Sequence, residues 1–462
     1  MPNPIANFAD CQQWLAPYAG DIFALGNSVY HGLGLLEILP ATKLICLDDD
    51  NLLPLLARER ATVFSLAARG ARSGYAFRSS ANLLAAPAVR EFLKKNSAKP
   101  WLYVPKVTSR TEIQARSVGA RLVGAPSRLN QEFEDKVSFT AKLAEWGLAT
   151  AAREDIEVSG ETLRAAVQRW GWPLVIQFSR GIAGEGTKFL ADEAELKEFA
   201  SRHQGRRAVA AKYLAGPTIT LNACVTRFGP VIGRPFWQIT GEPLLNRNQG
   251  GTGGNDYAVD LGCSPRQMAE IFRQASLIGN KMKVVGFRGI FGLDFVVGET
   301  VQVIEINARP TASIPTVTQL ERLAGEVPLL GLHLLEFLGV PYELDLARLN
   351  KIKADSAFQA SKVILRNTAD RPIVIGHDWA PGVYEWLEDR LVFRRPGWRI
   401  PDIGQTGECL VWTAKAGRQI NVNIEEAIIY FRRSVLDPKR RLDAETQKII
   451  KFLRSEIETD VA

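Results

Sequence analysis

Residues 286–295 read GFRGIFGLDF, and residues 301–310 read VQVIEINARP. Both stretches are short, apolar and rich in β-branched and aromatic residues, as strands of a half-buried sheet are. The dipeptide Gly298-Glu299 lies between them and suits a tight turn. The sequence therefore predicts two adjacent antiparallel strands at this point.

This hairpin would gather oxygen ligands on one face. Side chains alternate along a strand, so Glu305, Asn307 and Arg309 share a face, and strand pairing brings Asp294 beside Glu305. Two carboxylates and an amide oxygen suit Mg²⁺, or Mn²⁺ in its place, and such sites often link carboxylates to nucleotide phosphates. Arg309 can carry positive charge to a phosphoryl group or an oxyanion. The alternative is a solvated sheet face on which Arg309 forms a salt bridge with the carboxylates.

A second hairpin is expected upstream of these strands. A helix is predicted over residues 134–145 and another over 160–170. The strand at 173–178 is followed by a glycine-rich turn, GIAGEGT at 181–187, which leads directly into another strand. Walker and dinucleotide loops instead lead from a strand into a helix, so this turn belongs to neither class.

The first part of the chain alternates strands with helices. Apolar strands are expected at 21–26, 43–47, 101–104 and 121–124, and this alternation predicts a parallel, Rossmann-like sheet. The glycines after the first strand (Gly26, Gly32 and Gly34) do not have GxGxxG spacing, which argues against a dinucleotide site.

The remaining segments complete an α+β pattern. Strands are expected at 208–214, 218–226, 231–239, 289–297 and 300–307, with a helix at 265–284. The polar, glycine-rich stretch 246–257 is predicted to be a mobile loop with a functional role; the alternative is an exposed hairpin tip. From about residue 350 the chain is β-rich, with helices predicted at 425–433 and 444–457.

Composition excludes several classes of protein. The 462 residues carry a net charge of +7, but the basic residues are dispersed, which argues against a nucleic-acid partner. The five scattered cysteines predict neither a disulfide framework nor a zinc site. The most apolar stretch, 327–340, is too short to span a membrane, and no signal peptide is visible, so we expect a cytoplasmic protein. The four histidines share no motif; they are His31, His203, His333 and His377.

Taken in order, these segments resemble the ATP-grasp superfamily, which includes biotin carboxylase and many carboxylate–amine ligases. The resemblance covers residues 126–315 and rests on four pieces: Asp135-Lys136 before a helix, the hairpin at 173–190, the AKYLAG stretch at 211–216, and the strands from Arg288 to Arg309. Each piece alone is weak, and their common order makes the resemblance specific.

The resemblance implies a role for each of these positions. Lys136 and Gln177 would contact ATP phosphates, and the backbone of Lys212, Tyr213 and Leu214 would bind adenine. Asp294, Glu305 and Asn307 would hold Mg²⁺, with Arg309 and Arg288 as catalytic residues. The residues covering the phosphates would be Gly181, Gly184, Gly186 and Thr187, since glycines let backbone N–H groups approach oxyanions closely.

Two positions depart from the family pattern. Gln177 stands where the family usually has a second ATP lysine, and Ala211 stands where a hinge glutamate is common. An amide can donate a hydrogen bond to phosphate but supplies no charge. Either Lys188, Arg180 or Lys212 would supply that charge, or the site would bind ATP weakly.

We therefore expect an α/β and α+β multidomain protein, divided as follows: a Rossmann-like domain at 1–125, a first ATP-grasp lobe with the flap at 126–207, a second lobe with the metal strands at 208–348, and a β-rich C-terminal domain at 349–462. The expected reaction is ADP-forming ligation of a small-molecule carboxylate to an amine, with ATP and Mg²⁺ as cofactors. The alternatives are a carboxylase acting through carboxyphosphate, a kinase-like enzyme, and a non-catalytic nucleotide-binding module. A homo-oligomer is compatible with the sequence.

Overall fold

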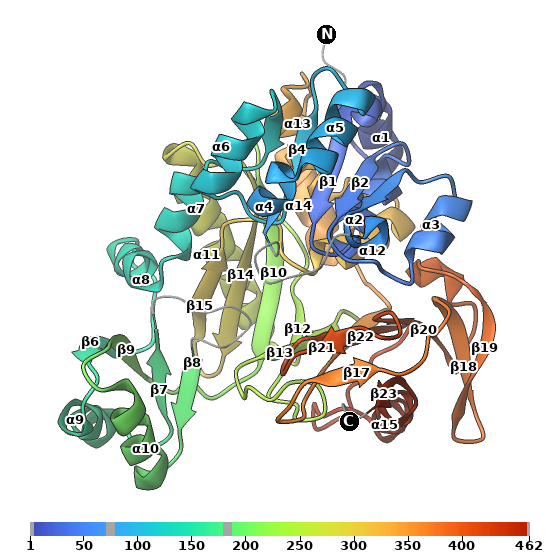
Figure 1. Cartoon of the computed structure of the whole chain (residues 1–462). Helices are drawn as coiled ribbons and strands as arrows, with labels where there is room; N and C mark the ends of the chain where they lie inside the picture. Colours follow the sequence, from blue (N-terminus) through green and yellow to red (C-terminus); the bar gives the residue numbers. More distant parts are fainter. Residues whose placement is uncertain (1–3, 71–78, 179–186, 460–462) are drawn as a thin grey trace.

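The computed structural model describes residues 4–70, 79–178 and 187–459. Figure 1 shows an N-terminal unit (blue) above a broad sheet, with a small green lobe standing to one side. The sheet continues from the yellow-green strands into the orange tail. The mixed α/β and α+β class predicted from the sequence is confirmed.

The N-terminal unit is built on a parallel sheet in the order β3-β2-β1-β4-β5. Its central strand β1 is buried along its whole length, because helices cover both faces of a parallel sheet. The strands are β1 (Ile22–Gly26), β2 (Lys43–Cys46), β3 (Val63–Ser65), β4 (Trp101–Tyr103) and β5 (Arg121–Val123). The helices are α1 (Phe8–Leu15), η1 (Ala16–Asp21), α2 (Tyr30–Ile38), α3 (Leu53–Arg58), η2 (Ala67–Arg69), α4 (Ser80–Ala85), α5 (Pro87–Asn96) and α6 (Ser109–Ser117).

The small lobe has its own antiparallel sheet, in the order β6-β9-β7-β8. It follows α7 (Ser127–Glu134), and Asp135 separates that helix from α8 by capping the N-terminus of α8. The sequence predicted one helix over 134–145, and the structure begins α8 at Lys136 instead. The lobe contains α8 (Lys136–Glu145), β6 (Arg153–Glu157), α9 (Gly160–Trp170), β7 (Leu174–Gln177), β8 (Thr187–Leu190), α10 (Glu193–His203) and β9 (Arg207–Lys212).

The large sheet is antiparallel and runs β15-β14-β10-β12-β13-β16-β22-β20-β18-β19, with β11 paired to β10. Its first half contains β10 (Thr218–Val225), β11 (Pro230–Ile232), β12 (Phe236–Thr240), β13 (Thr252–Asp256), α11 (Pro265–Val284), β14 (Gly289–Val297) and β15 (Val301–Asn307). Helices α12 (Ile314–Leu323), α13 (Leu329–Leu338) and α14 (Leu346–Asp355) follow. The tail contains β16 (Ser361–Arg366), β17 (Ile373–Ile375), β18 (Gly382–Leu387), β19 (Arg390–Pro396), η4 (Ile400–Asp402), β20 (Glu408–Thr413), β21 (Gln419–Ile420), β22 (Glu425–Phe431), α15 (Ala444–Ile457) and β23 (Glu458–Thr459).

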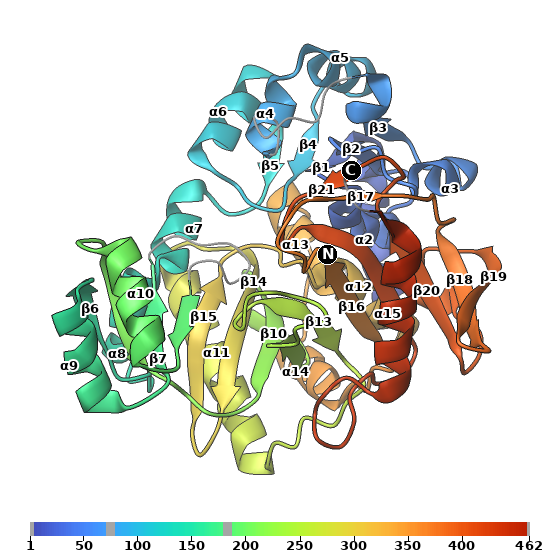
Figure 2. The same ribbon diagram turned by 60° about the horizontal axis from the view of Figure 1, so that its bottom comes forward.

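Alternation along β10 and β14 divides the large sheet into two faces. Leu221 and Leu293 pack in the core beneath α11, whereas Cys224 and Ile290 pack in a different core, together with α13. Thr220, Asn222 and Asp294 are an even number of residues away from Cys224 or Ile290 on the same strands, so their side chains lie on that second face. Figure 2 shows α11 against the strands of the second lobe and α15 against those of the tail. The face of the sheet opposite α11 therefore carries these polar residues.

The predicted mobile loop at 246–257 is wrong for its second half. Thr252–Asp256 form β13, which pairs with both β12 and β16 inside the sheet. Glycines and Asn-Asp are poor strand formers in isolation, and here the neighbouring strands override that preference. Gly254 is needed, because a Cβ on it would lie 2.0 Å from the Lys362 carbonyl oxygen.

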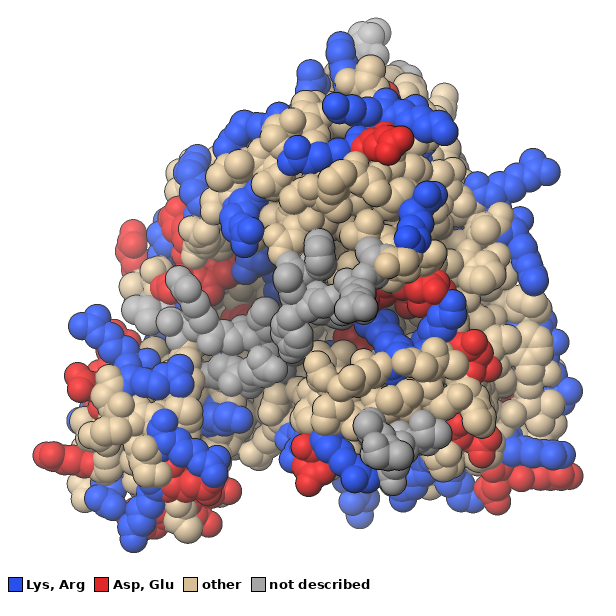
Figure 3. Space-filling model, in the orientation of Figure 1, with Lys and Arg blue, Asp and Glu red and all other residues tan. Residues whose placement is uncertain are grey.

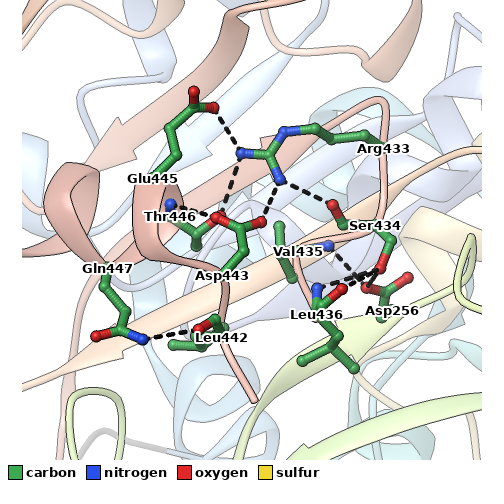
Figure 4. Close-up of polar contacts among 10 residues, drawn as sticks. All are labelled: Asp256, Arg433, Ser434, Val435, Leu436, Leu442, Asp443, Glu445, Thr446 and Gln447. Carbon is green, nitrogen blue, oxygen red and sulfur yellow. Dashed lines mark hydrogen bonds and ion pairs between the residues drawn. The ribbon is translucent and has the colours of Figure 1, made fainter. Parts of the chain in front are cut away.

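Asp256, at the end of β13, anchors the tail to the sheet. Figure 4 shows its carboxylate accepting hydrogen bonds from the Ser434 hydroxyl (2.7 Å) and the Val435 N–H (2.8 Å). Two further N–H groups, of Ala258 and Val259, donate to its other oxygen. Burial raises the pKa of Asp256, and these four donors compensate for the lost solvation.

The helix predicted at 425–433 is also wrong. Residues 425–431 form β22, which lies between β16 and β20. Its Ile-Ile-Tyr-Phe run at 428–431 favours a strand, and pairing on both sides stabilises it. The helix predicted at 444–457 is confirmed as α15.

Two other expectations also agree with the structure. All five cysteines are free thiols. Among the helices that the structure describes, none is long and apolar enough to cross a membrane.

Candidate functional site

The two metal strands pair as the sequence predicts. Asp294 of β14 lies directly opposite Glu305 of β15, and Gly292 lies opposite Asn307. The strand pair contains a register shift at Asp294, and the partly exposed Ile304 lies beside it on β15. The shift interrupts the alternation of side chains along β15. Val303 and Ile306, which are three residues apart, therefore both pack into the core beneath α11.

Asp294 and Glu305 are close enough to disfavour each other's charge. Asp294 is buried, and burial together with the Glu305 carboxylate raises its pKa. The Thr220 hydroxyl donates to Asp294 at 2.6 Å, and the Lys136 ammonium lies 3.7 Å from Glu305. A divalent cation would relieve this repulsion and hold both carboxylates ionised, so the donor set fits Mg²⁺.

Asn307 supplies a third oxygen on this face. Among the described residues no group of three or more His, Cys, Asp or Glu side chains is arranged to hold a metal ion. A cation bound by Asp294 and Glu305 would therefore rely on Asn307 and on oxygens of a ligand to complete its coordination.

Arg309 is held beside these strands from two sides. Its Nη2 donates to Asn307 Oδ1 at 2.9 Å, and its Nε lies 3.0 Å from Glu134 Oε1. Glu134 is the last residue of α7, so α7 fixes the guanidinium. Nothing in the sequence indicated Glu134, because it lies 175 residues away from Arg309 and carries no motif.

Arg288 does not join this cluster. Its guanidinium donates to the Lys283 and Phe287 carbonyls and lies 3.9 Å from Glu336. Glu336 also accepts from Arg227, so this group of charges surrounds the start of β14. Asp294 lies six residues further along the chain, in β14, so about 20 Å of extended chain separates Arg288 from Asp294.

The turn after Arg309 is fixed by hydroxyl and amide groups. Thr311 Oγ1 donates to Asn222 Oδ1 at 2.7 Å, and Asn222 Nδ2 donates to Ser313 Oγ at 2.8 Å. Gly292 allows this approach, since a Cβ there would lie 2.6 Å from the Thr311 methyl group. Sequence reasoning missed these residues because none carries a motif.

Two other units reach the same turn. The Tyr30 hydroxyl of α2 donates to the Ala312 carbonyl at 2.6 Å, and the Lys362 ammonium of β16 donates to it at 3.1 Å. Lys362 also donates to the Tyr30 hydroxyl at 2.9 Å. Lys362 is buried and, among the described residues, forms no ion pair with a carboxylate, so its pKa is lowered by burial.

The hairpin β7–β8 faces the second lobe. Leu174 and Ile176 enter the core of the small lobe, so Gln177 points to the face that α9 and α10 leave open. Its partner across the hairpin is Thr187. The flap residues Gly181, Gly184 and Gly186 lie outside the described residues.

The small lobe touches the second lobe at Gly250. A Cβ on Gly250 would lie 2.9 Å from the Phe189 ring and 4.0 Å from the Thr187 methyl group. The Phe189 ring also meets the Tyr213 ring edge to face, with centroids 6.0 Å apart. The first half of the 246–257 stretch therefore borders the hairpin.

The predicted hinge follows β9. The Lys212 N–H donates to the Ala152 carbonyl at 2.8 Å, and its side chain is exposed. Within the described residues, Tyr213 and Leu214 take no part in backbone–backbone hydrogen bonds. Their peptide groups are therefore free to bind a planar heterocycle.

Comparisons with known proteins agree with this geometry. Residues 135–223 match the family model "Carbamoyl-phosphate synthase L chain, ATP binding domain". The segment includes α8, the β7–β8 hairpin and the hinge. The chain has the ATP-grasp fold. A search of curated protein sequences gave no match.

Solved structures with the ATP-grasp fold cover nearly the whole chain. The biotin carboxylase domain of Hydrogenobacter thermophilus 2-oxoglutarate carboxylase, in complex with MgADP, ADP and bicarbonate, is 14% identical with a TM-score of 0.58, over 90% of this chain and 86% of that one. An N5-carboxyaminoimidazole ribonucleotide synthetase in complex with ADP is 12% identical with a TM-score of 0.58, over 94% and 97%. Phosphoribosylamine–glycine ligase from Thermotoga maritima is 14% identical with a TM-score of 0.55, over 95% and 98%. These likenesses establish the fold.

Proposed function

We propose that this protein is an ATP-dependent ligase that phosphorylates a carboxylate, joins the acyl phosphate to an amine, and releases ADP and phosphate. The observation that carries the proposal is the opposed pair Asp294–Glu305, with Lys136 and Arg309 on either side of it. Two carboxylates that repel each other on paired strands are best explained by a cation bound together with a nucleotide.

The nucleotide would lie between the two lobes. The free peptide groups of Tyr213 and Leu214 would bind adenine, and Lys136 would turn from Glu305 to the phosphates. Asp294, Glu305 and Asn307 would hold Mg²⁺, which neutralises phosphate charge when bound. Gln177 and Thr187 would donate to phosphate oxygens from the small lobe.

Arg309 would act where the new bond forms. A carboxylate is a poor electrophile, and phosphorylation supplies the leaving group that amide formation requires. The carboxylate oxygen attacks the γ-phosphorus, and the bond to ADP breaks. Arg309, which Glu134 and Asn307 hold in place, would stabilise the charge on the transferred group.

Two assays test the proposed function. The protein is incubated with Mg–ATP and a pool of small carboxylic acids, with and without a pool of amines, and the nucleotide product is identified. ADP should form only when the correct acid is present, and hydroxylamine should trap that acid as a hydroxamate. AMP as the product would contradict phosphoryl transfer, and the absence of any acid-dependent turnover would favour a non-catalytic module.

A second candidate is carboxylation of an amine through carboxyphosphate. It is favoured by the likeness to a biotin carboxylase domain in complex with bicarbonate and to an N5-carboxyaminoimidazole ribonucleotide synthetase. The same assay separates the two reactions, because bicarbonate would then replace the acid in supporting ADP release. A phosphorylated acceptor as the stable end product would instead select a kinase-like enzyme.

A further inference from the structure

His31 lies where the N-terminal unit meets the metal strands. It belongs to the first turn of α2, five residues after the end of β1. Strand order in that sheet reverses at β1, whose neighbours are β2 and β4. In open parallel sheets, ligands bind beyond the carboxyl ends of the strands at such a reversal. The His31 ring lies against Gly26, where a Cβ would be 3.1 Å from its Cδ2.

The residue before His31 ties the start of α2 to the Arg309 turn. That residue, Tyr30, donates to the Ala312 carbonyl, three residues after Arg309. Lys362 bridges the same two groups from β16. The charged groups that act on the His31 ring come from three different elements: Arg309, Lys362 on β16 and Glu425 on β22. His31 therefore lies near enough to Arg309 for the guanidinium charge to act on its ring.

The ring is half-buried and its nitrogens are free. Among the described residues no hydrogen bond involves the His31 side chain, although it lies close to several charged groups. Figure 3 shows charged side chains of both signs around the hollow between the upper and lower units. Ion pairs also join the N-terminal unit to the tail, at Asp49–Lys415 (2.7 Å) and Asp48–Arg418 (3.0 Å). Each of these four charges has an ion-pair partner, whereas the His31 nitrogens have no hydrogen-bond partner within the described part of the chain.

We propose that His31 accepts the proton of the attacking amine in the ligation step. The inference rests on the proposed function. The amine nitrogen attacks the acyl carbon and forms the C–N bond, the bond from that carbon to the phosphate oxygen breaks, and phosphate leaves with the electron pair. The nitrogen then carries one proton too many, and a ring nitrogen of His31 takes it.

The pKa of His31 would depend on whether an anionic acyl phosphate is bound. Burial, together with Arg309 and Lys362, lowers the pKa of His31 to about 4, and Glu425 acts in the opposite direction. The imidazole of His31 is therefore neutral at neutral pH. An anionic acyl phosphate beside Arg309 and Lys362 would offset their charge, and the pKa of His31 would then rise toward the range in which a base is effective.

The test compares two nucleophiles in the full-length protein. His31→Gln keeps a polar side chain but cannot take up a proton. The acid and amine are the pair that the pool assays give for the wild type, and hydroxylamine is the second nucleophile. Hydroxylamine is weakly basic and mostly unprotonated at neutral pH, and after its attack the nitrogen is acidic enough to lose its extra proton to water without His31. His377→Gln, an exposed position after β17, is the matched control.

We expect His31→Gln to form hydroxamate within about twofold of the wild type and to form amide on the order of a hundredfold more slowly at pH 7. The amide rate should recover as the pH rises and the free amine becomes unprotonated. Amide formation at the wild-type rate would overturn the proposal. Equal loss of both reactions, in a variant with an unchanged melting temperature, would also overturn it and assign His31 a positioning role.

A substitute variant and an NMR titration provide further tests of the His31 proposal. If His31→Gln does not fold, His31→Asn replaces it in both assays. The ring signals of the four histidines can be titrated by NMR, and His31 is identified as the signal missing from the variant. A signal that stays neutral to about pH 4 in the free protein and titrates at higher pH with Mg–ATP and the acid supports the proposal, and an unchanged titration contradicts it. Absence of hydroxamate from the wild type would instead reject the proposed function itself.

Discussion

Glu305 is a proposed metal ligand whose side chain is 42% exposed, so its role can be separated from folding. Replacing it with Gln removes the repulsion on Asp294 and should change stability by no more than about 0.5 kcal/mol. The amide binds Mg²⁺ poorly, and losing about 3 kcal/mol of transition-state stabilisation should slow ATP turnover about a hundredfold. Melting curves should show that Mg–ATP stabilises the wild type but not Glu305→Gln. Glu299→Gln, exposed in the same hairpin, should retain both properties, and near-normal turnover in Glu305→Gln would remove the metal assignment.

A second prediction concerns Lys136. Its ammonium lies 3.7 Å from Glu305, a long contact that a phosphate group could replace. A charge-assisted hydrogen bond from Lys136 to phosphate is worth about 1.5–3 kcal/mol. Lys136→Ala should therefore raise the ATP concentration needed for half-maximal turnover by roughly tenfold or more. Lys142→Ala, on the same helix and paired with Glu132, serves as the control. Equal ATP requirements in the two variants would place the phosphates elsewhere.

At the scale of elements, the β7–β8 hairpin and the second lobe meet at Gly250. Gly250→Val would push a branched side chain into the Phe189 ring, which lies 2.9 Å from the position of the added Cβ. If the hairpin covers the nucleotide, the variant should raise the ATP requirement and lower turnover together, while the melting temperature stays within a few degrees. Gly20→Val, where the Cβ has nothing within 4 Å, is the control. A variant at position 250 with normal kinetics would show that the hairpin does not close there.

The sequence predicted those elements whose pattern is local. The β14–β15 hairpin carries its own turn and alternation, and the register of Asp294 with Glu305 follows from them. The strand β13 could not be predicted, because its glycines become a strand only between β12 and β16, which lies about a hundred residues later. Likewise Glu134, Tyr30 and Lys362 reach the Arg309 turn through tertiary contacts between distant segments, which no spacing rule reveals.

At the scale of the whole molecule, the second lobe and the tail share one sheet, whereas the small lobe has its own. The pairing of β13 with β16 joins the second lobe to the tail within one sheet. The boundary expected near residue 348 would therefore not separate two folding units. Without β16, β13 would become an unpaired edge strand, and the apolar residues packed against that part of the sheet would be exposed to water. We therefore expect β10, β14, β16 and β22 to unfold together, and β7 and β9 to unfold separately.

Hydrogen exchange measured along a denaturant series tests this directly. Gly254→Ala would place a Cβ 2.0 Å from the Lys362 carbonyl oxygen, at a φ of +142° that L residues rarely adopt. It should cost more than about 2 kcal/mol and lower the midpoints of β14 and β16 by the same amount, with β7 unchanged. Gly171→Ala, at a φ of +77° in the small lobe with open space around it, should cost about 1 kcal/mol and shift only β7 and β9. If Gly254→Ala instead destabilised β16 and left β14 unchanged, the two halves would be independent domains, and the continuity of the sheet would not be what holds the metal strands against the tail.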